Sequence, residues 1–86
     1  MDTIKIQTAA VKFMICDLMQ STDDHEHYRK EMMDAHAVVA AELGNDWSEW
    51  TAGYCVDHHL DGMEIALWPV ANWDHFLQVA RGLITT

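Results

Sequence analysis

The sequence predicts an α+β fold in which a small antiparallel sheet packs against about three helices. Three patterns support this prediction: apolar residues at helical spacing in the first half of the chain, a hairpin-type dipeptide at Asp61-Gly62, and a short capped helix near the C-terminus. The 86 residues, half of them hydrophobic, suffice for one modest core. We therefore expect a single domain over residues 1–86.

The first segment has two interpretations. Thr3 to Gln7 alternate polar and apolar side chains, which is typical of an edge strand, but they could equally form the first turn of the helix that follows. That helix is expected to bury the residues at positions i, i+3, i+4 and i+7, which are Val11, Met14, Ile15 and Leu18.

A second helix is predicted to begin after Ser21, which can cap it, with Asp24 three residues later in a capping-box position. Asp23, Asp24 and Glu26 then lie in the first turn, where the helix dipole favours negative charge. Gly44 is expected to end this helix. Its core-facing side chains are predicted to be Tyr28, Met32, Ala35, Val39 and Leu43.

A β-hairpin is predicted in the second half of the chain. Its strands run from Tyr54 to Leu60 and from Met63 to Trp68, joined by a type I′ turn at Asp61-Gly62. Pro69 would end the second strand because it cannot donate a ladder hydrogen bond. Asn72 would then cap a last helix that Gly82 ends and whose inner face comprises Trp73, Phe76, Leu77, Ala80 and Leu83.

Residues 21–36 are rich in acids and histidines, which suggests a metal site. Ligands on one helix must be three or four residues apart, a spacing that Asp23 and Asp24 satisfy with His27 but His25 does not. Capping and the helix dipole explain the acids without a metal, so we predict none. One alternative function is a metal- or ligand-binding module that uses the histidines, namely His25, His27, His58 and His59.

The sequence shows no catalytic centre. The hairpin would place His59 opposite Glu64, but no nucleophile or oxyanion hole accompanies them, so we interpret them as an ordinary cross-strand pair. His58 is interpreted as a core histidine. Cys16 and Cys55 lack a basic neighbour that would lower a thiol pKa, and we interpret them as buried thiols, with a disulfide left open. We predict no enzyme activity and no cofactor.

Charge is the most unusual property of the chain. The 14 acids and five bases give a net charge of −9, and from Glu31 to Ala80 there are nine carboxylates and no Lys or Arg. Such a surface repels nucleic acid and anionic lipid but attracts basic surfaces. The expected partner is therefore a basic protein, with no direct contact to nucleic acid or membrane.

Residues Asn45 to Thr51 place Trp47 and Trp50 three positions apart, between Asp46 and Glu49. In a helical turn both indoles would lie on one side. We favour the interpretation that they close the hydrophobic core. The alternative is an exposed aromatic anchor rimmed by carboxylates, which would suit a basic partner.

No apolar run approaches the ~20 residues that span a bilayer. The N-terminus also lacks the basic stretch and apolar core of a signal peptide. We therefore expect a cytoplasmic protein.

In size, acidity and single-domain character the chain resembles small inhibitors from phages and mobile elements, namely anti-CRISPR proteins and anti-restriction proteins that mimic DNA. It is also similar in size and charge to barstar-like immunity proteins, which block basic nuclease clefts. The resemblance implies a non-catalytic inhibitor that occludes the nucleic-acid site of a CRISPR effector complex or nuclease. A homo-oligomeric accessory domain is a further alternative. The predicted partner-binding residues are Asp46, Trp47, Glu49, Trp50, Asp57, Asp61 and Glu64, with Asp23, Asp24 and Glu26 as a second patch.

Overall fold

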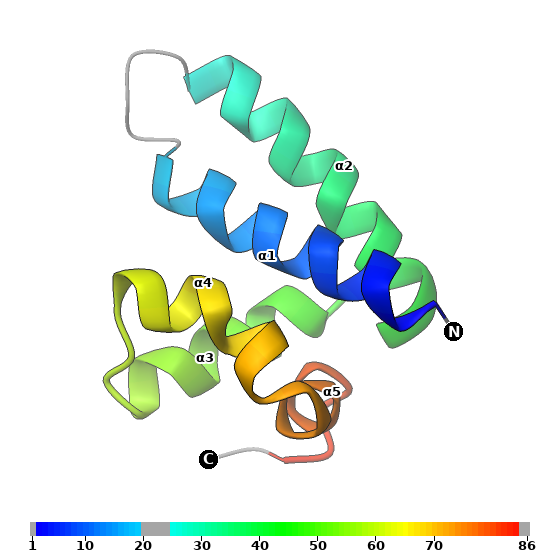
Figure 1. Cartoon of the computed structure of the whole chain (residues 1–86), viewed down its shortest axis with the longest axis vertical. Helices are drawn as coiled ribbons and strands as arrows, with labels where there is room; N and C mark the ends of the chain where they lie inside the picture. Colours follow the sequence, from blue (N-terminus) through cyan, green and yellow to red (C-terminus); the bar gives the residue numbers. More distant parts are fainter. Residues whose placement is uncertain (1, 20–24, 85–86) are drawn as a thin grey trace.

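The computed structural model describes residues 2–19 and 25–84, and in this part of the chain it contains α-helices and no strand. The predicted α+β fold with an antiparallel sheet is therefore wrong, and the fold is all-helical. The helices follow one another around a shared interior (Figure 1). They are α1 (Thr3–Met19), α2 (His25–Leu43), α3 (Trp47–Asp57), α4 (Gly62–Ala71) and α5 (Trp73–Ala80).

Helix α1 begins at Thr3, so the first-turn interpretation of residues 3–7 is confirmed and the edge strand is wrong. The predicted inner stripe is only partly correct, because Met14 is buried whereas Ile15 and Leu18 are each 45% exposed. The buried arc is centred instead on residues that face α2 and α4, the two helices packed against α1. Its members are Ile6, Ala9, Ala10, Met14 and Cys16.

Helix α2 lies alongside α1 (Figure 1) and follows the predicted pattern in its second half, whereas the predicted core residues Tyr28 and Met32 are only half-buried. Ala35, Val39 and Leu43 are buried, as expected for one face of a 3.6-residue repeat. Gly44 has a φ of 97° and donates its backbone N–H to the Ala40 carbonyl at 2.9 Å, which ends the helix as predicted. The predicted cap at Ser21 and the first-turn acids Asp23 and Asp24 lie outside the described residues.

The predicted hairpin is wrong, because its two strands belong to α3 and α4 and Asp61-Gly62 lies where α4 begins. Trp47, Thr51 and Cys55 are all buried in α3, and their spacing of four residues is helical. The predicted strand began at Tyr54 and therefore cut through this stripe. Asp61 does not form a hairpin turn. Its backbone carbonyl instead accepts a hydrogen bond from the Glu64 N–H in the first turn of α4, at 2.8 Å.

Helix α3 ends in a Schellman motif, the arrangement that closes many helices with a left-handed residue. His59 takes the left-handed position with a φ of 58°. The N–H of Leu60 donates to the Cys55 carbonyl at 2.9 Å, and the N–H of His59 donates to the Val56 carbonyl at 3.2 Å. These bonds turn the chain toward α4 in a few residues.

Helix α5 ends in the same motif, with Gly82 at the left-handed position and a φ of 73°. Leu83 donates its backbone N–H to Gln78 at 2.9 Å, and Gly82 donates to Val79 at 2.9 Å. Gly82 was predicted to end this helix, which is confirmed. Leu83 was predicted to face the core, which is wrong, since it lies past the motif and is 71% exposed.

Pro69 was predicted to end a strand, but it lies fully buried inside α4, which continues to Ala71. Its carbonyl accepts a hydrogen bond from the Gln7 side chain at 3.4 Å, which links α4 to α1. Asn72 directly precedes α5, as predicted, although its side chain makes no capping hydrogen bond. Phe76 and Ala80 of the predicted inner face of α5 are buried.

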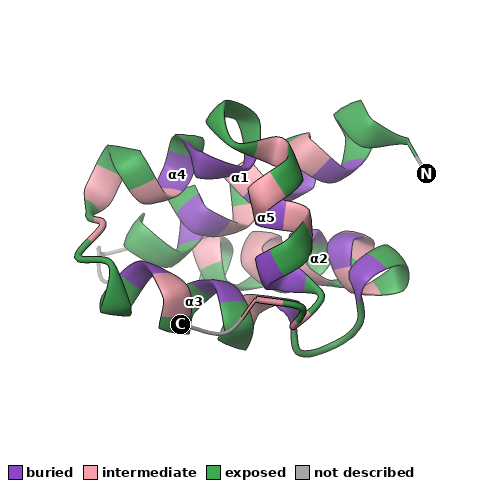
Figure 2. Cartoon of the chain, turned by 90° about the horizontal axis from the view of Figure 1, so that it is seen from below, coloured by how far each residue is buried: buried purple, intermediate pink, exposed green. Residues whose placement is uncertain are grey.

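Trp47 joins the two halves of the core. Its ring packs 4.9 Å from Phe13 of α1, 5.4 Å from His36 of α2 and 6.2 Å from Phe76 of α5, measured between ring centroids. Its Nε1–H donates to the His36 carbonyl at 3.2 Å, so the buried indole has a partner for its polar group. Figure 2 shows the buried residues on the sides where the helices meet and the exposed ones on their outer sides.

Candidate functional site

Folding separates the charges of the chain into two regions. The α1–α2 hairpin carries four of the five basic residues, Lys5, Lys12, Arg29 and Lys30. Helices α3 to α5 with their connections, residues 44–80, contain no Lys or Arg, and we call this region the acidic half. Six carboxylates lie in it and all are exposed: Asp46, Glu49, Asp57, Asp61, Glu64 and Asp74.

Three of the predicted partner-binding carboxylates come together where α3 connects to α4. Asp57 is the last residue of α3, Asp61 directly precedes α4, and Glu64 lies in the first turn of α4. Asp46 and Glu49 lie at the opposite end of α3, and at 1.5 Å per residue Asp46 is about 16 Å from Asp57 along the axis. Five of the six acids of this region thus form two groups at the two ends of α3, and the sixth, Asp74, lies in the first turn of α5.

The predicted second patch belongs to the other region. Glu26 is exposed in the first turn of α2, with Arg29 and Lys30 one helical turn away. Its charge is therefore partly offset by nearby bases. Asp23 and Asp24, the other two predicted members, lie outside the described residues.

The two tryptophans of α3 were predicted either to close the core or to form an exposed anchor, and they differ in burial. Trp47 is fully buried, which matches the interpretation of a residue that closes the core. Trp50 is 43% exposed and packs beside Gly82, where an added Cβ would meet the indole at 3.2 Å. Only Trp50 of the two therefore presents aromatic surface that a partner could contact.

Charges in the α1–α2 hairpin pair across its two helices, where Lys12 forms an ion pair with Glu31. The hydrogen bond to Lys12 lowers the pKa of the Glu31 carboxyl. The same bond to Glu31 raises the pKa of Lys12. A pairing of this kind with Lys or Arg has no equivalent within residues 44–80, because that region contains neither residue type.

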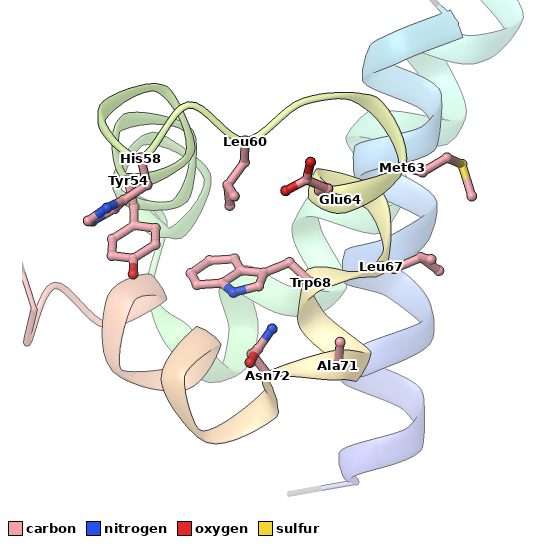
Figure 3. Close-up of a pocket in the computed structure, with 9 residues that line it drawn as sticks. All are labelled: Tyr54, His58, Leu60, Met63, Glu64, Leu67, Trp68, Ala71 and Asn72. Atoms are coloured by element: carbon pink, nitrogen blue, oxygen red, sulfur yellow. The ribbon is translucent and has the colours of Figure 1, made fainter.

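A pocket of about 460 Å³ opens between α3 and α4 in the acidic half (Figure 3). The Glu64 carboxylate points into it from α4, and Tyr54 and His58 line the opposite side from α3. Leu60 lies above Trp68, whose indole forms the inner wall. The described residues that line the pocket are Tyr54, His58, Leu60, Met63, Glu64, Leu67, Trp68, Ala71 and Asn72.

Aromatic contacts hold the pocket wall in place. The rings of Tyr54 and Trp68 are nearly parallel, with centroids 4.9 Å apart, and His58 lies 4.0 Å from Tyr54. His75 of α5 packs edge-on against both, 5.0 Å from Tyr54 and 5.6 Å from Trp68. Because three helices contribute to this cluster, the wall is fixed by the tertiary fold.

Most residues of this pocket were not predicted from the sequence as site residues. Tyr54 and His58 are four residues apart, and so are Trp68 and Asn72, which places each pair on one face of a helix. The hairpin hypothesis hid these spacings, because it assigned Tyr54, His58 and Trp68 to strands rather than to helices. A helical interpretation of both segments would have indicated two aromatic faces able to meet.

The predicted pairing of His59 with Glu64 across a hairpin does not exist, since the two residues belong to the end of α3 and the start of α4. His58, predicted to be a core histidine, is exposed. Within residues 2–19 and 25–84, no three His, Cys, Asp or Glu side chains gather closely enough to hold a metal ion.

Cys16 and Cys55 are buried free thiols, as the buried-thiol interpretation expected, and no disulfide joins them. Burial raises the pKa of both thiols above the ordinary value. A thiol with a raised pKa is mostly protonated at neutral pH and is a poor nucleophile. The structure therefore offers no activated cysteine among these two.

No protein-family model, curated protein or solved structure matches this chain. Among the helices of the described residues, none is long and apolar enough to cross a membrane.

Proposed function

We propose that this chain is a small cytoplasmic inhibitor that binds a basic nucleic-acid-binding protein and occludes its nucleic-acid site, in the manner of an anti-CRISPR or DNA-mimic protein. The observation that supports the proposal is the acidic half: six exposed carboxylates on three helices and their connections, and no Lys or Arg within residues 44–80. Carboxylates and phosphates both offer oxyanions to arginine and lysine. The inhibitor would act by occupancy, without catalysis.

Two features of the acidic half divide the work of binding. The exposed carboxylates raise the association rate, because a surface of one sign steers an oppositely charged partner over several ångströms. Partly exposed aromatic surface at Trp50 supplies a contact that lengthens the lifetime of the complex. The group formed by Asp57, Asp61 and Glu64 is the expected centre of the electrostatic contact, since the three lie around one helix connection.

The test is a competition assay with purified CRISPR effector complexes and basic nucleases, each bound to fluorescent DNA. We expect the protein to displace the DNA from at least one of them at near-stoichiometric ratios, and less well at high salt because ions screen the charges. The charge-reversed variant Asp57→Lys/Asp61→Lys/Glu64→Lys is expected to associate about 10–1000-fold more slowly at low salt.

A matched control reverses three exposed acids on α2, Glu26→Lys, Asp34→Lys and Glu42→Lys, and changes the net charge by the same amount. We expect it to retain most of the binding. Equal losses in both variants would show that net charge matters rather than the acidic half. Failure to displace DNA from any target, with helicity retained by circular dichroism, would refute the proposed function.

Lysines near the N-terminus of α4 oppose its dipole, and they could unfold the first variant. The neutral variant Asp57→Asn/Asp61→Asn/Glu64→Gln avoids this problem, because it removes the negative charges without adding positive ones. It should keep the helicity of the parent and still associate more slowly. Unchanged association in this variant would exclude these three residues as the contact.

A further inference from the structure

The pocket between α3 and α4 is of a size that binds ligands, since such sites usually measure about 300–1,000 Å³. Its wall is largely apolar and aromatic, formed by Tyr54, Leu60 and Trp68 (Figure 3). Nearly parallel packing of Tyr54 and Trp68, with His75 edge-on behind them, holds these rings in one arrangement. A ligand would therefore bind against a pocket wall that is already formed in the free protein.

The polar groups of the pocket select for a cation. Among the described residues, Glu64 is the one carboxylate in the lining and no Lys or Arg lines the pocket. The Glu64 carboxylate points from α4 toward Leu60, above the Trp68 indole (Figure 3). Asp57 ends α3 and Asp61 precedes α4, so both flank the connection that carries the lining residue Leu60 and add to the negative potential of this region. An apolar wall with one carboxylate suits a ligand that has an alkyl stem and a cationic end.

We propose that this pocket receives an arginine side chain from the basic partner, with the guanidinium at Glu64 and the alkyl stem against Leu60 and Trp68. This inference rests on the proposed function, because the arginine belongs to the protein that is inhibited. Arginine fits better than lysine, since a planar guanidinium pairs with a carboxylate through two parallel hydrogen bonds, whereas a lysine ammonium is a point charge.

The probe is the peptide acetyl-Gly-Arg-Gly-amide, titrated into the ¹⁵N-labelled protein while NMR spectra are recorded. We expect saturable shifts at the Trp68 indole N–H and at the backbone of Glu64 and Leu60. The same peptide with citrulline, which keeps the shape but not the charge, should bind at least about tenfold more weakly. Equal binding of the citrulline peptide, or shifts confined to other residues, would overturn the proposal.

Glu64→Gln removes the charge and keeps the shape, and it should weaken the arginine peptide by about 3–10-fold, as expected for the loss of one partly exposed charge-assisted contact. Glu42→Gln is the matched control, since it removes an exposed carboxylate of α2 that lies outside the acidic half and does not line the pocket. It should leave the peptide affinity unchanged. Equal weakening in both variants, or a lysine peptide that binds as tightly as arginine, would contradict an arginine site.

The two proposals fail in different ways. A protein that binds the arginine peptide at Glu64 but displaces DNA from no target retains the pocket as an arginine site and loses the inhibitor function. A protein that inhibits a target, yet shows no peptide shifts and no effect of Glu64→Gln on that inhibition, retains the function and loses the pocket.

Discussion

The α1–α2 hairpin and the acidic half are stabilised by different means. The hairpin has two long helices of 17 and 19 residues, mixed charges and an ion pair between its helices. The acidic half has helices of 11, 10 and 8 residues, an aromatic cluster and no Lys or Arg within residues 44–80. Helices this short are marginal in isolation, so packing and end motifs must hold them. Because these helices are held by their buried faces and their ends, the outer surface of the acidic half can carry unbalanced negative charge.

Trp47 tests whether the two regions form one core. Trp47→Ala should lower the free energy of unfolding by about 3–5 kcal/mol, because the indole is fully buried against Phe13, His36 and Phe76 from both regions. Urea denaturation followed by circular dichroism measures the change. This is the largest effect that we expect from a single substitution.

The control is Trp50→Ala, which removes the same side chain from the same helix at a position 43% exposed. We expect it to cost roughly 1 kcal/mol or less. Similar losses at both positions would contradict the unequal roles of the two tryptophans. A Trp47→Ala protein that keeps the hairpin folded while the acidic half melts would show that the regions are separate cores.

The ends of α3 and α5 provide a second test, because the same motif has His59 in one helix and Gly82 in the other. A left-handed conformation strains any residue with a Cβ. His59→Gly should therefore stabilise the protein by about 0.5–1 kcal/mol, since the relief of strain exceeds the added entropy of the unfolded chain. Thermal and urea denaturation would detect this gain.

Gly82→Ala is the opposite substitution and should destabilise the protein by about 1–2 kcal/mol. The added Cβ would also lie 3.2 Å from the Trp50 indole, so the Trp50 side chain must shift slightly. A loss of stability in His59→Gly would mean that the histidine ring contributes more than its backbone costs. That outcome would show that side-chain contacts of His59 stabilise this turn by more than its left-handed backbone conformation destabilises it.

The smallest expected effect concerns the ion pair of the hairpin. Because Lys12 lowers the pKa of Glu31, the pair stabilises the fold above the ordinary carboxyl pKa of about 4.3, and this contribution disappears as the pH falls through the lower pKa of the folded state. Lys12→Gln should therefore lower the urea midpoint slightly at pH 7, and this difference should shrink steadily as the pH falls below about 4.3. A difference that does not shrink in acid would contradict an electrostatic origin.

Lys5→Gln is the control for this measurement, since it removes the same charge from the same helix without touching Glu31. Its pH dependence should follow that of the parent protein. The two exposed side chains are screened by water and salt, so high salt should also remove the difference between Lys12→Gln and the parent.

Prediction from the sequence was accurate where local pattern and tertiary burial agree. The Ala35, Val39 and Leu43 stripe and the terminal Gly44 identified α2, because one helix face is buried over the second half of the helix. The hairpin failed because Asp61-Gly62 is common both in two-residue turns and in helix connections, and the segments beside it are short. Their helical spacing becomes evident only across the boundary at Tyr54, where Thr51 and Cys55 share one buried face.

For the candidate site, too, some features follow from the sequence and others only from the tertiary structure. The exclusion of Lys and Arg from Glu31 to Ala80 is a property of the sequence, and most charged side chains stay at the surface in any fold because burying a charge is costly. Tertiary packing decided which tryptophan of α3 is buried. Trp47 is the one that contacts Phe13 of α1 and Phe76 of α5. The pocket with Glu64 at its edge was likewise decided by tertiary structure alone, since it forms where α3, α4 and α5 bring distant aromatic rings into contact.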